Sequence, residues 1–371
     1  MPIRTSVRVV LAVLVLTVVL PPHLPTTAQP LPYKGMWISA EELACLPQTG
    51  PAWEQVKSVA DAPADTPNLS DQDEDTDIRV LAKALVYAKT GQSRYLQDVL
   101  EALRTITYKN TENGGRTLAL GRNLVGYVIA ADLINLPAVD ADLDADFRKK
   151  LRELLTKELD GSTLQLTHEE RANNWGTNAG ASRAAVAIYL GDQAELARTA
   201  LVFQGWVGDR QAYAGFRYGD DLSWQADPDN PVPVNPKGAT KEGHSIDGAL
   251  PEEMRRGGAF QWPPKETNYP WAGLQGAYVQ AHLLARAGYP EVWEWEDRAL
   301  LRAIEFLYAI DWPAEGDDEW LIWMVNAVYA TNFPAAVPAR PGKNMGWTDW
   351  TLSRQCGPLS EVVYLPLITR P

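Results

Sequence analysis

Apolar residues recur at helical spacing over most of the chain, and short glycine-containing turns interrupt the pattern. Residues 77–106 predict a helix hairpin, because one periodic run ends at Thr90-Gly91 and a second begins near Tyr95. The same arrangement returns in residues 179–207, with its break at Gly191-Asp192, and in residues 274–310. A further helix is expected over residues 121–135. Helices packed on helices therefore dominate the expected fold.

In each hairpin the first helix is rich in alanine and glycine and nearly lacks charge, whereas the second is more charged and amphipathic. A helix that is apolar all round is expected to be buried on all sides, and an amphipathic helix is expected to cover it. Alternating inner and outer helices predict an all-α fold, an incomplete (α/α) toroid of helix hairpins with long loops. The expected domain spans residues 29–350, and residues 351–371 form a short extended tail.

The segment from 205 to 267 is different, because it is rich in Gly, Pro, Asp and Trp. Long loops between helices tend to be functional. A disordered linker is the alternative, but the aromatic residues between Phe216 and Trp262 argue against it. We therefore expect an ordered, functional loop.

The N-terminus has the features of a secretion signal. Arg4 and Arg8 precede a largely apolar run from Val9 to Leu20, and small residues lead up to Ala28. These features predict cleavage near residue 28 and a secreted, extracellular or periplasmic protein. An uncleaved N-terminal anchor is the alternative. We expect no other membrane association and a monomer.

The formal net charge is -13, which disfavours nucleic acid as a partner because phosphate binding needs a basic face. A local basic cleft on an acidic protein can still bind an anionic polysaccharide. Cys45 and Cys356 could form a disulfide in an exported chain, and two unpaired thiols are the alternative. The histidines lack metal-ligand spacing, so we expect no metal and no cofactor.

Several of the 14 tryptophans lie in predicted loops, where exposed aromatic faces can stack on sugar rings. Core packing is the more common role for any single Trp. As a group, loop tryptophans beside polar residues favour a carbohydrate site. The candidates for substrate contact include Trp175, Trp262 and Trp271.

Two adjacent amides, Asn173 and Asn174, precede the inner helix of the second hairpin. One Asn can cap the helix, but a second amide exceeds that need. A helix start also favours an anion such as a uronate carboxylate. Asn173 and Asn174 are therefore candidate contacts for a substrate carboxylate.

Titratable residues concentrate in residues 244–271. Arg255 and Arg256 offer planar forks for a carboxylate, and ion pairs to Glu252 or Glu253 are the alternative. Tyr269 precedes a proline and is expected in a non-helical entry to the next inner helix. His244 lies in a loop bordered by glycines. His282 is expected to be structural, and His168, beside two glutamates, is expected at the surface.

This set of residues suits β-elimination next to a uronic acid. That reaction needs a neutralised carboxylate, a base for the C5 proton and an acid for the leaving oxygen. Amide and Arg donors suit the first role, and Tyr and His suit the others. A glycoside hydrolase would instead need two carboxylic acids across the bond. The available candidates are Asp220, Asp221, Asp227, Asp247 and Glu252.

At these residues the chain resembles the alginate lyases, the poly(β-D-mannuronate) lyases built as α/α toroids. "NNWGTNAGASRAAVAIYLGD" (173–192) is similar to the family's Asn-Asn-His segment that opens an inner helix. "DGALPEEMRRGG" (247–258), followed by a Tyr and the next inner helix, is similar to its "DG-x-LP-x-E-x-x-RG" run. The likeness spans roughly residues 35–335, with specific motifs over about 60 of them.

The resemblance implies that an Asn of the 173–174 pair binds substrate, that Arg256 neutralises the carboxylate and that Tyr269 is catalytic. The family's His corresponds to Trp175 here. The base would then be His244, or Tyr269 would act as both base and acid in a syn elimination. The Trp also leaves open a different uronate polymer, or a protein that binds a glycan without cutting it.

Overall fold

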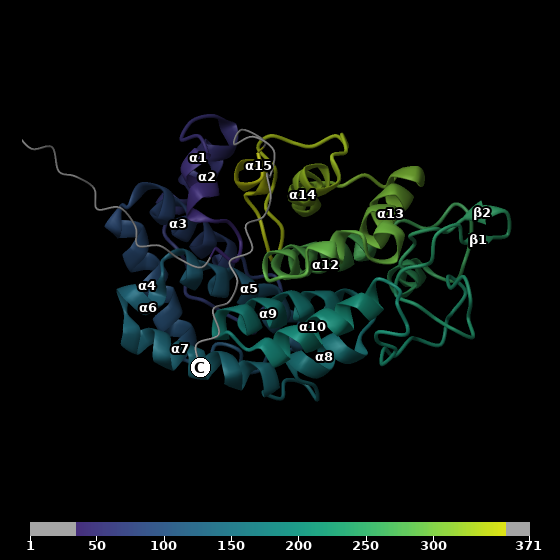
Figure 1. The fold of residues 1–371 in the computed structure, drawn as a ribbon, viewed down its shortest axis with the longest axis horizontal. Helices are drawn as coiled ribbons and strands as arrows, with labels where there is room; N and C mark the ends of the chain where they lie inside the picture. The colour runs from purple at the N-terminus through teal and green to yellow at the C-terminus, as the bar shows by residue number, and fades with distance from the viewer. Residues whose placement is uncertain (1–34, 354–371) are drawn as a thin grey trace, which may run out of the picture.

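The structure is a computed structural model that describes residues 35–353. Within these residues the chain is mostly helical, as expected for an all-α fold, with a single small antiparallel sheet of β1 (Thr240–Lys241) and β2 (His244–Ser245) (Figure 1). The longer α-helices are α2 (Pro51–Asp61), α3 (Thr76–Thr90), α4 (Ser93–Tyr108), α5 (Thr117–Leu133), α7 (Ala141–Thr156), α9 (Asn174–Leu190), α10 (Gln193–Trp206), α12 (Tyr269–Arg286), α13 (Trp295–Ala309) and α14 (Glu319–Tyr329). The short helices are α1 (Ala40–Cys45), α6 (Leu136–Val139), α8 (Leu164–Glu170), α11 (Pro251–Met254), α15 (Thr348–Thr351) and the 3-10 turns η1 (Arg255–Gly257), η2 (Pro290–Trp293) and η3 (Gly316–Asp318).

The predicted hairpin turns are confirmed. Gly91 is the C-cap of α3 and Gly191 is the C-cap of α9, and both glycines take the left-handed conformation that ends many helices. Asp192 then caps α10 by accepting the N–H of Glu195 at 3.0 Å. The third hairpin turns at Gly288 and passes through η2 before α13 begins.

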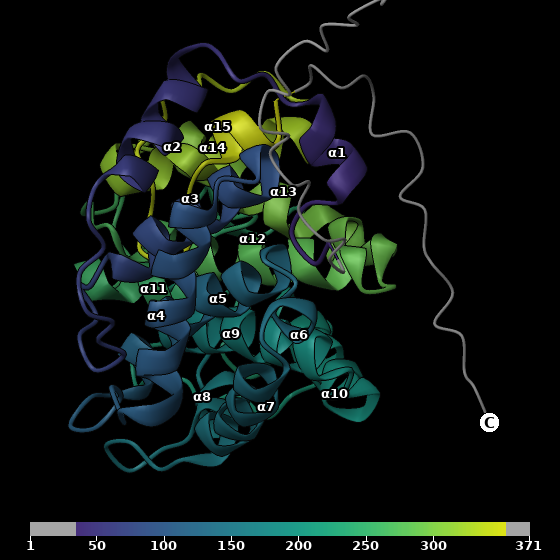
Figure 2. The ribbon, with the colours of Figure 1, turned by 90° about the vertical axis from the view of Figure 1, so that its left-hand side faces the viewer.

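The inner helices α3, α5, α9 and α12 are buried over most of their length, and every residue of α5 is buried. They pack in succession, α3 on α5, α5 on α9 and α9 on α12. Figures 1 and 2 show them side by side, with α4, α7 and α10 outside them. The alternation of inner and outer helices is thus confirmed, and the incomplete toroid stays a prediction about the overall arrangement.

Glycines allow α9 and α12 to approach closely. A Cβ added to Gly276 would lie 2.5 Å from the backbone N of Asn178, and one added to Gly180 would lie 2.1 Å from Oε1 of Gln280. A larger side chain at Gly276 would require movement of the α9 backbone, and one at Gly180 would displace the side chains of Gln280 and His168. The alanine- and glycine-rich composition of these helices therefore sets their spacing.

The C-terminal helix α15 packs near the N-terminal helices. α15 packs on α2, where the Trp350 and Trp53 rings lie 5.1 Å apart, and Trp347 donates its Nε1–H to the carbonyl of Ile78 at 3.3 Å. At the far end of α12, His282 is buried and its Nε2 lies 2.8 Å from the carbonyl oxygen of Trp37. The structural role expected for His282 is confirmed.

The segment between α10 and α12 forms a long irregular loop that carries β1, β2 and α11, at the right of Figure 1. Its backbone is held by side chains. Asn235 accepts the N–H of Ala226 and donates to the carbonyl of Trp224, and Arg302 of α13 donates to the carbonyl of Asn235. The loop is therefore part of the folded domain, as expected.

Several predictions concern residues outside the described range. The signal segment 1–28 and most of the extended tail lie there, and so does Cys356, so the disulfide to the exposed Cys45 stays a prediction. Across residues 35–353, no helix combines the length and apolar character that crossing a membrane requires.

Candidate active site

The start of α9 separates the roles of the two adjacent amides. Asn173 is the N-cap, with extended backbone, and its Oδ1 accepts the N–H of Trp175 at 3.2 Å. Asn174 is the first residue of the helix and is buried. Its buried side-chain oxygen, Oδ1, has no hydrogen-bond partner among residues 35–353. One amide therefore caps the helix, and the other is left without a structural partner.

Glu253, on α11, holds Asn174 in place. Its buried carboxyl group accepts the backbone N–H of Asn174. Burial raises the pKa of Glu253 to about 8, opposed by the Asn174 N–H and by the charge of Arg256. Sequence reasoning treated Glu253 only as an alternative partner for the arginines. The contact joins residues 79 positions apart, so no local pattern indicates it.

Arg256 and Tyr269 form a pair beside this contact. A guanidinium nitrogen of Arg256 donates to the Tyr269 hydroxyl at 3.3 Å, and its central carbon lies 4.5 Å from the centre of the phenol ring. Both side chains are exposed, Tyr269 by 39%. Tyr269 is the first residue of α12 rather than part of an entry before it, since Pro270 suits the first turn of a helix.

The pair lies at the same end of the inner helices as Asn174. Asn178, one turn after Asn174, reaches the carbonyl of Ala272, one turn after Tyr269, at 3.5 Å. Glu253 contacts Asn174, and it also lies against α12, because a Cβ added to Gly273 would be 3.1 Å from Oε1 of Glu253. The structure therefore brings Asn174, Arg256 and Tyr269 together, as expected.

Arg255 is not free to bind a substrate carboxylate, which corrects its candidate role. It pairs with Glu252 at 2.7 Å, and Glu252 also accepts the N–H of Gly219 at 3.1 Å. This ion pair is the alternative that the sequence left open. It fixes the loop before α11 against the turn that carries Arg256.

Trp271 is also misassigned as a substrate contact. It is 3% exposed and donates its Nε1–H to the carbonyl of Trp312 at 3.3 Å. Its spacing from Leu274 and Tyr278 on α12 places it on a buried helix face. The loop tryptophans Trp224, Trp347 and Trp350 are buried as well.

Trp175, which corresponds to the family's His, is half-buried beneath two cations. The guanidinium groups of Arg171 and Arg116 lie 5.0 Å and 5.9 Å from its ring centre. An indole has no basic nitrogen, so Trp175 cannot remove a proton. It supplies an aromatic surface near the start of α9.

His244 and Trp262 meet in the long loop. Their rings are stacked with centroids 4.4 Å apart and planes inclined by 11°, and Trp262 is 38% exposed. The His244 ring contacts Trp262 through this stack. Within residues 35–353, no hydrogen bond joins the ring to Asn174, Arg256 or Tyr269. The two candidate residues therefore form one aromatic stack, in which His244 covers one face of Trp262.

His168 corrects another expectation, since it is buried rather than at the surface. Its Nε2 lies 3.1 Å from Nε2 of Gln280, and its Nδ1 lies 3.3 Å from a nitrogen of Arg183. Burial, together with the charges of Arg183 and Arg198, lowers its pKa well below the usual value. His168 is thus a neutral core residue between α8, α9 and α12.

Four of the five carboxylates proposed for a hydrolase hold the loop together. Asp221 accepts the N–H of Ser223 at 2.9 Å, and Asp227 accepts that of Asp229 at 3.0 Å. Asp247 pairs with Arg302 at 2.5 Å, and Glu252 pairs with Arg255. These four carboxylates are thus engaged in bonds that hold the loop.

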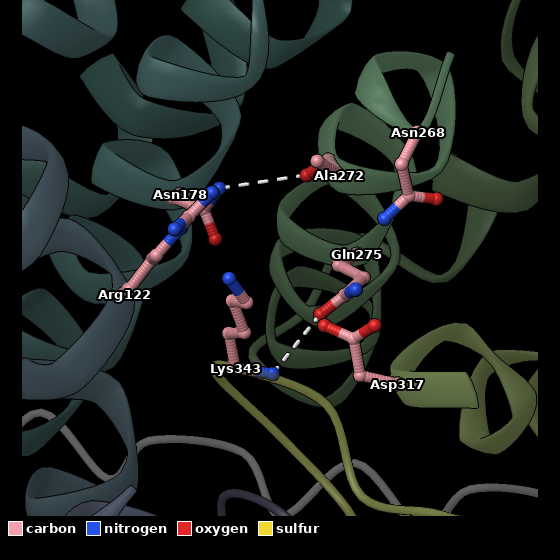
Figure 3. A pocket seen from close by; sticks show the side chains of 7 residues that line it. All are labelled: Arg122, Asn178, Asn268, Ala272, Gln275, Asp317 and Lys343. Atoms are coloured by element: carbon pink, nitrogen blue, oxygen red, sulfur yellow. Dashed lines mark hydrogen bonds between the residues drawn. The ribbon is translucent and has the colours of Figure 1, made fainter. Parts of the chain in front are cut away.

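A polar cavity of about 40 Å³ opens next to this end of α9 and α12 (Figure 3). It is lined by Arg122, Asn178, Asn268, Ala272, Gln275, Asp317 and Lys343. Sequence reasoning missed these residues. The available signal was Arg122 itself, a charged residue within the mostly apolar α5. In the part of the chain that the structure describes, no cluster of three or more His, Cys, Asp or Glu side chains is arranged to hold a metal ion.

The first part of the domain matches a known family. The model of the alginate lyase family matches residues 44–215, which include α9 and both amides at its start. No curated protein matches the chain. The family match ends before Arg256 and Tyr269, so their place beside Asn174 rests on the contacts described above. The match over residues 44–215 thus supports membership of the chain in the alginate lyase family, a family of polysaccharide lyases.

Proposed function

We propose that the protein is an exported lyase that cleaves a uronate-containing, alginate-like polysaccharide by β-elimination. The observation that carries the proposal is the exposed pair of Arg256 and Tyr269, with their hydrogen bond of 3.3 Å, beside the unbonded amide of Asn174. The family match supports the reaction class, and the predicted signal segment supports export.

The first requirement of the reaction is neutralisation of the uronate carboxylate, because the C5 proton is otherwise too weakly acidic to remove. The side-chain N–H groups of Asn174 can donate to one carboxylate oxygen. Arg256 carries five N–H donors, so it can bind the carboxylate and still contact Tyr269. These donors stabilise the negative charge that develops as the proton leaves.

Tyr269 is positioned to serve as both base and acid. Its phenolate oxygen takes the C5 proton, the C5–H electron pair forms the C4=C5 double bond, and the C4–O4 bond breaks. The phenol then returns the proton to the departing O4. One group on one face of the sugar makes the elimination syn. The adjacent Arg256 stabilises the charge that Tyr269 carries during the reaction.

We assign the stacked rings of His244 and Trp262 to substrate binding. An exposed indole face offers apolar contact to the C–H face of a sugar ring, and His244 supports it from the other side. This arrangement favours Tyr269 over His244 as the base. His244 then contributes to affinity rather than to proton transfer.

The proposal is tested by incubating the protein with alginate, glucuronan, hyaluronan, heparin-type chains and pectate. The expected product is an unsaturated uronate, detected by its ultraviolet absorbance. New reducing ends without that absorbance would instead indicate a hydrolase. A protein that binds one of the polymers without releasing product would be a non-catalytic glycan-binding protein.

A further inference from the structure

The cavity lined by Arg122 lies one helical turn beyond the proposed reaction centre. Asn178 follows Asn174 by four residues on α9, and Ala272 follows Tyr269 by three on α12. With a rise of about 1.5 Å per residue, the displacement along the helices is roughly 5–6 Å. That distance is comparable to the length of one pyranose ring.

Arg122 enters this cavity as a buried cation without an acidic partner. It is 8% exposed, forms no ion pair within residues 35–353, and donates to the carbonyl of Gln72 at 3.3 Å. Desolvation lowers its pKa despite the charges of Asp73, Asp317 and Glu253. A buried unpaired guanidinium lowers the stability of the folded protein. An anion that binds there offsets this loss.

A second cation, Lys343, reaches the same space, which Asp317 also lines. The amide N–H groups of Asn178 and Gln275 already donate within the protein, to the carbonyls of Asn174 and Ala272 and to Asp318. Figure 3 shows Arg122 and Asn178 on one side of the cavity, and Asn268, the N-cap of α12, with Gln275 of α12 on the other, with the Lys343 side chain between them. Lys343 also pairs with Asp73 at 2.9 Å. Both partners are substantially exposed, so this ion pair contributes little to stability and can give way to a ligand.

The cavity admits a carboxylate but not a sugar ring. Its volume of about 40 Å³ exceeds what one water molecule needs. A larger groove of about 610 Å³ shares Asp317 and Lys343 with it and continues along Arg340 and Trp347 toward α3. A sugar in the groove can therefore place its acidic group in the cavity.

We propose that Arg122 and Lys343 form a second carboxylate site, which binds the uronate next to the one held by Asn174 and Arg256. This inference rests on the proposed function. Its consequence is selectivity for chains in which consecutive sugars are acidic, because an alternating chain presents a neutral sugar to Arg122.

The test uses the Tyr269→Phe variant, so that oligosaccharides bind without being cut. Calorimetric titration with alginate and glucuronan oligosaccharides is compared with titration of the Tyr269→Phe/Arg122→Gln double variant. A lost charge-assisted hydrogen bond weakens binding by roughly 10- to 100-fold, and we expect this loss. Arg104→Gln removes a half-exposed guanidinium that pairs with Asp140 and does not line the cavity. It serves as the control in the same background and should leave affinity unchanged.

Two further variants keep the test decisive if Arg122→Gln folds poorly. Arg122→Lys retains the charge and should retain most of the affinity, whereas Lys343→Gln, at a partly exposed side chain, should lose several-fold. In hyaluronan acidic sugars alternate with neutral ones, so it should bind equally to the Tyr269→Phe parent and to the variant that also carries Arg122→Gln. Unchanged alginate and glucuronan affinity in Arg122→Gln and Lys343→Gln, no binding of either by the parent, or an equal loss with hyaluronan would overturn the proposal.

Failure of the proposed function would be seen separately. Oligosaccharide binding that depends on Arg122, with no unsaturated product from the wild-type protein, would refute the lyase and leave the second carboxylate site standing. Efficient cleavage by the wild-type protein, with no effect of Arg122→Gln on KM or on affinity, would refute the second carboxylate site and leave the lyase standing.

Discussion

The carboxyl group of Glu253 accepts the backbone N–H of Asn174 and so ties the turn before Arg256 to the first residue of α9. This contact sets the position of Asn174 relative to Arg256 and Tyr269. It also places a buried acid, with its pKa raised to about 8, at the centre of the proposed active site.

Glu253 should make stability depend on pH. Its pKa is raised in the folded state, so between about pH 4.5 and 8 the folded protein keeps a proton that the unfolded chain has released. Stability therefore falls as pH rises through this window. In Glu253→Gln, which cannot ionise, the decrease should be smaller by a few kcal/mol. Thermal unfolding of both proteins at pH 5 and pH 8 measures the difference, and parallel pH profiles would contradict the assignment.

The two amides at the start of α9 should respond differently to alanine. Asn173→Ala removes a helix cap and should lower the free energy of unfolding by about 1 kcal/mol, with little change in turnover. Asn174→Ala removes an amide without a structural partner and keeps the backbone bond to Glu253. It should lower kcat/KM by roughly tenfold or more while stability changes little. Denaturant unfolding and initial rates on each variant separate the two roles. Loss of stability in Asn174→Ala with loss of turnover in Asn173→Ala would contradict the assignment.

Tyr269→Phe should abolish most of the activity without unfolding the protein. The side chain is 39% exposed, and the change removes only the hydroxyl that the proposed elimination uses. Loss of a general acid–base group should lower kcat by roughly 10²-fold or more. Tyr108→Phe, an exposed phenol on α4 bonded to Asp146, is the matched control. Comparable turnover in the two variants, measured by ultraviolet absorbance of the product, would exclude Tyr269 as the catalytic group.

Much of the fold could be predicted because its signals are local. The hairpin turns follow from Gly91 and Gly191, and the inner helices follow from their lack of charge. The site was only partly predictable. Asn174 and Tyr269 each lie at a recognisable helix start, but the contact of Glu253 with Asn174 depends on tertiary packing. The error at Trp271 was avoidable, since its helical spacing already indicated a buried face.

His244 provides the sharpest test of the proposed division of roles. If its ring supports Trp262 by stacking, then His244→Phe keeps an aromatic surface and should retain kcat within a few-fold. His244→Ala and Trp262→Ala should each raise KM, since loss of a stacked aromatic contact costs about 0.5–1.5 kcal/mol beyond its buried area. If His244 were the base, Phe and Ala would be equally inactive and the acidic limb of the pH–rate profile would disappear in both. Steady-state kinetics of the three variants from pH 5 to 9 therefore distinguishes a sugar-binding surface from a proton-transfer residue.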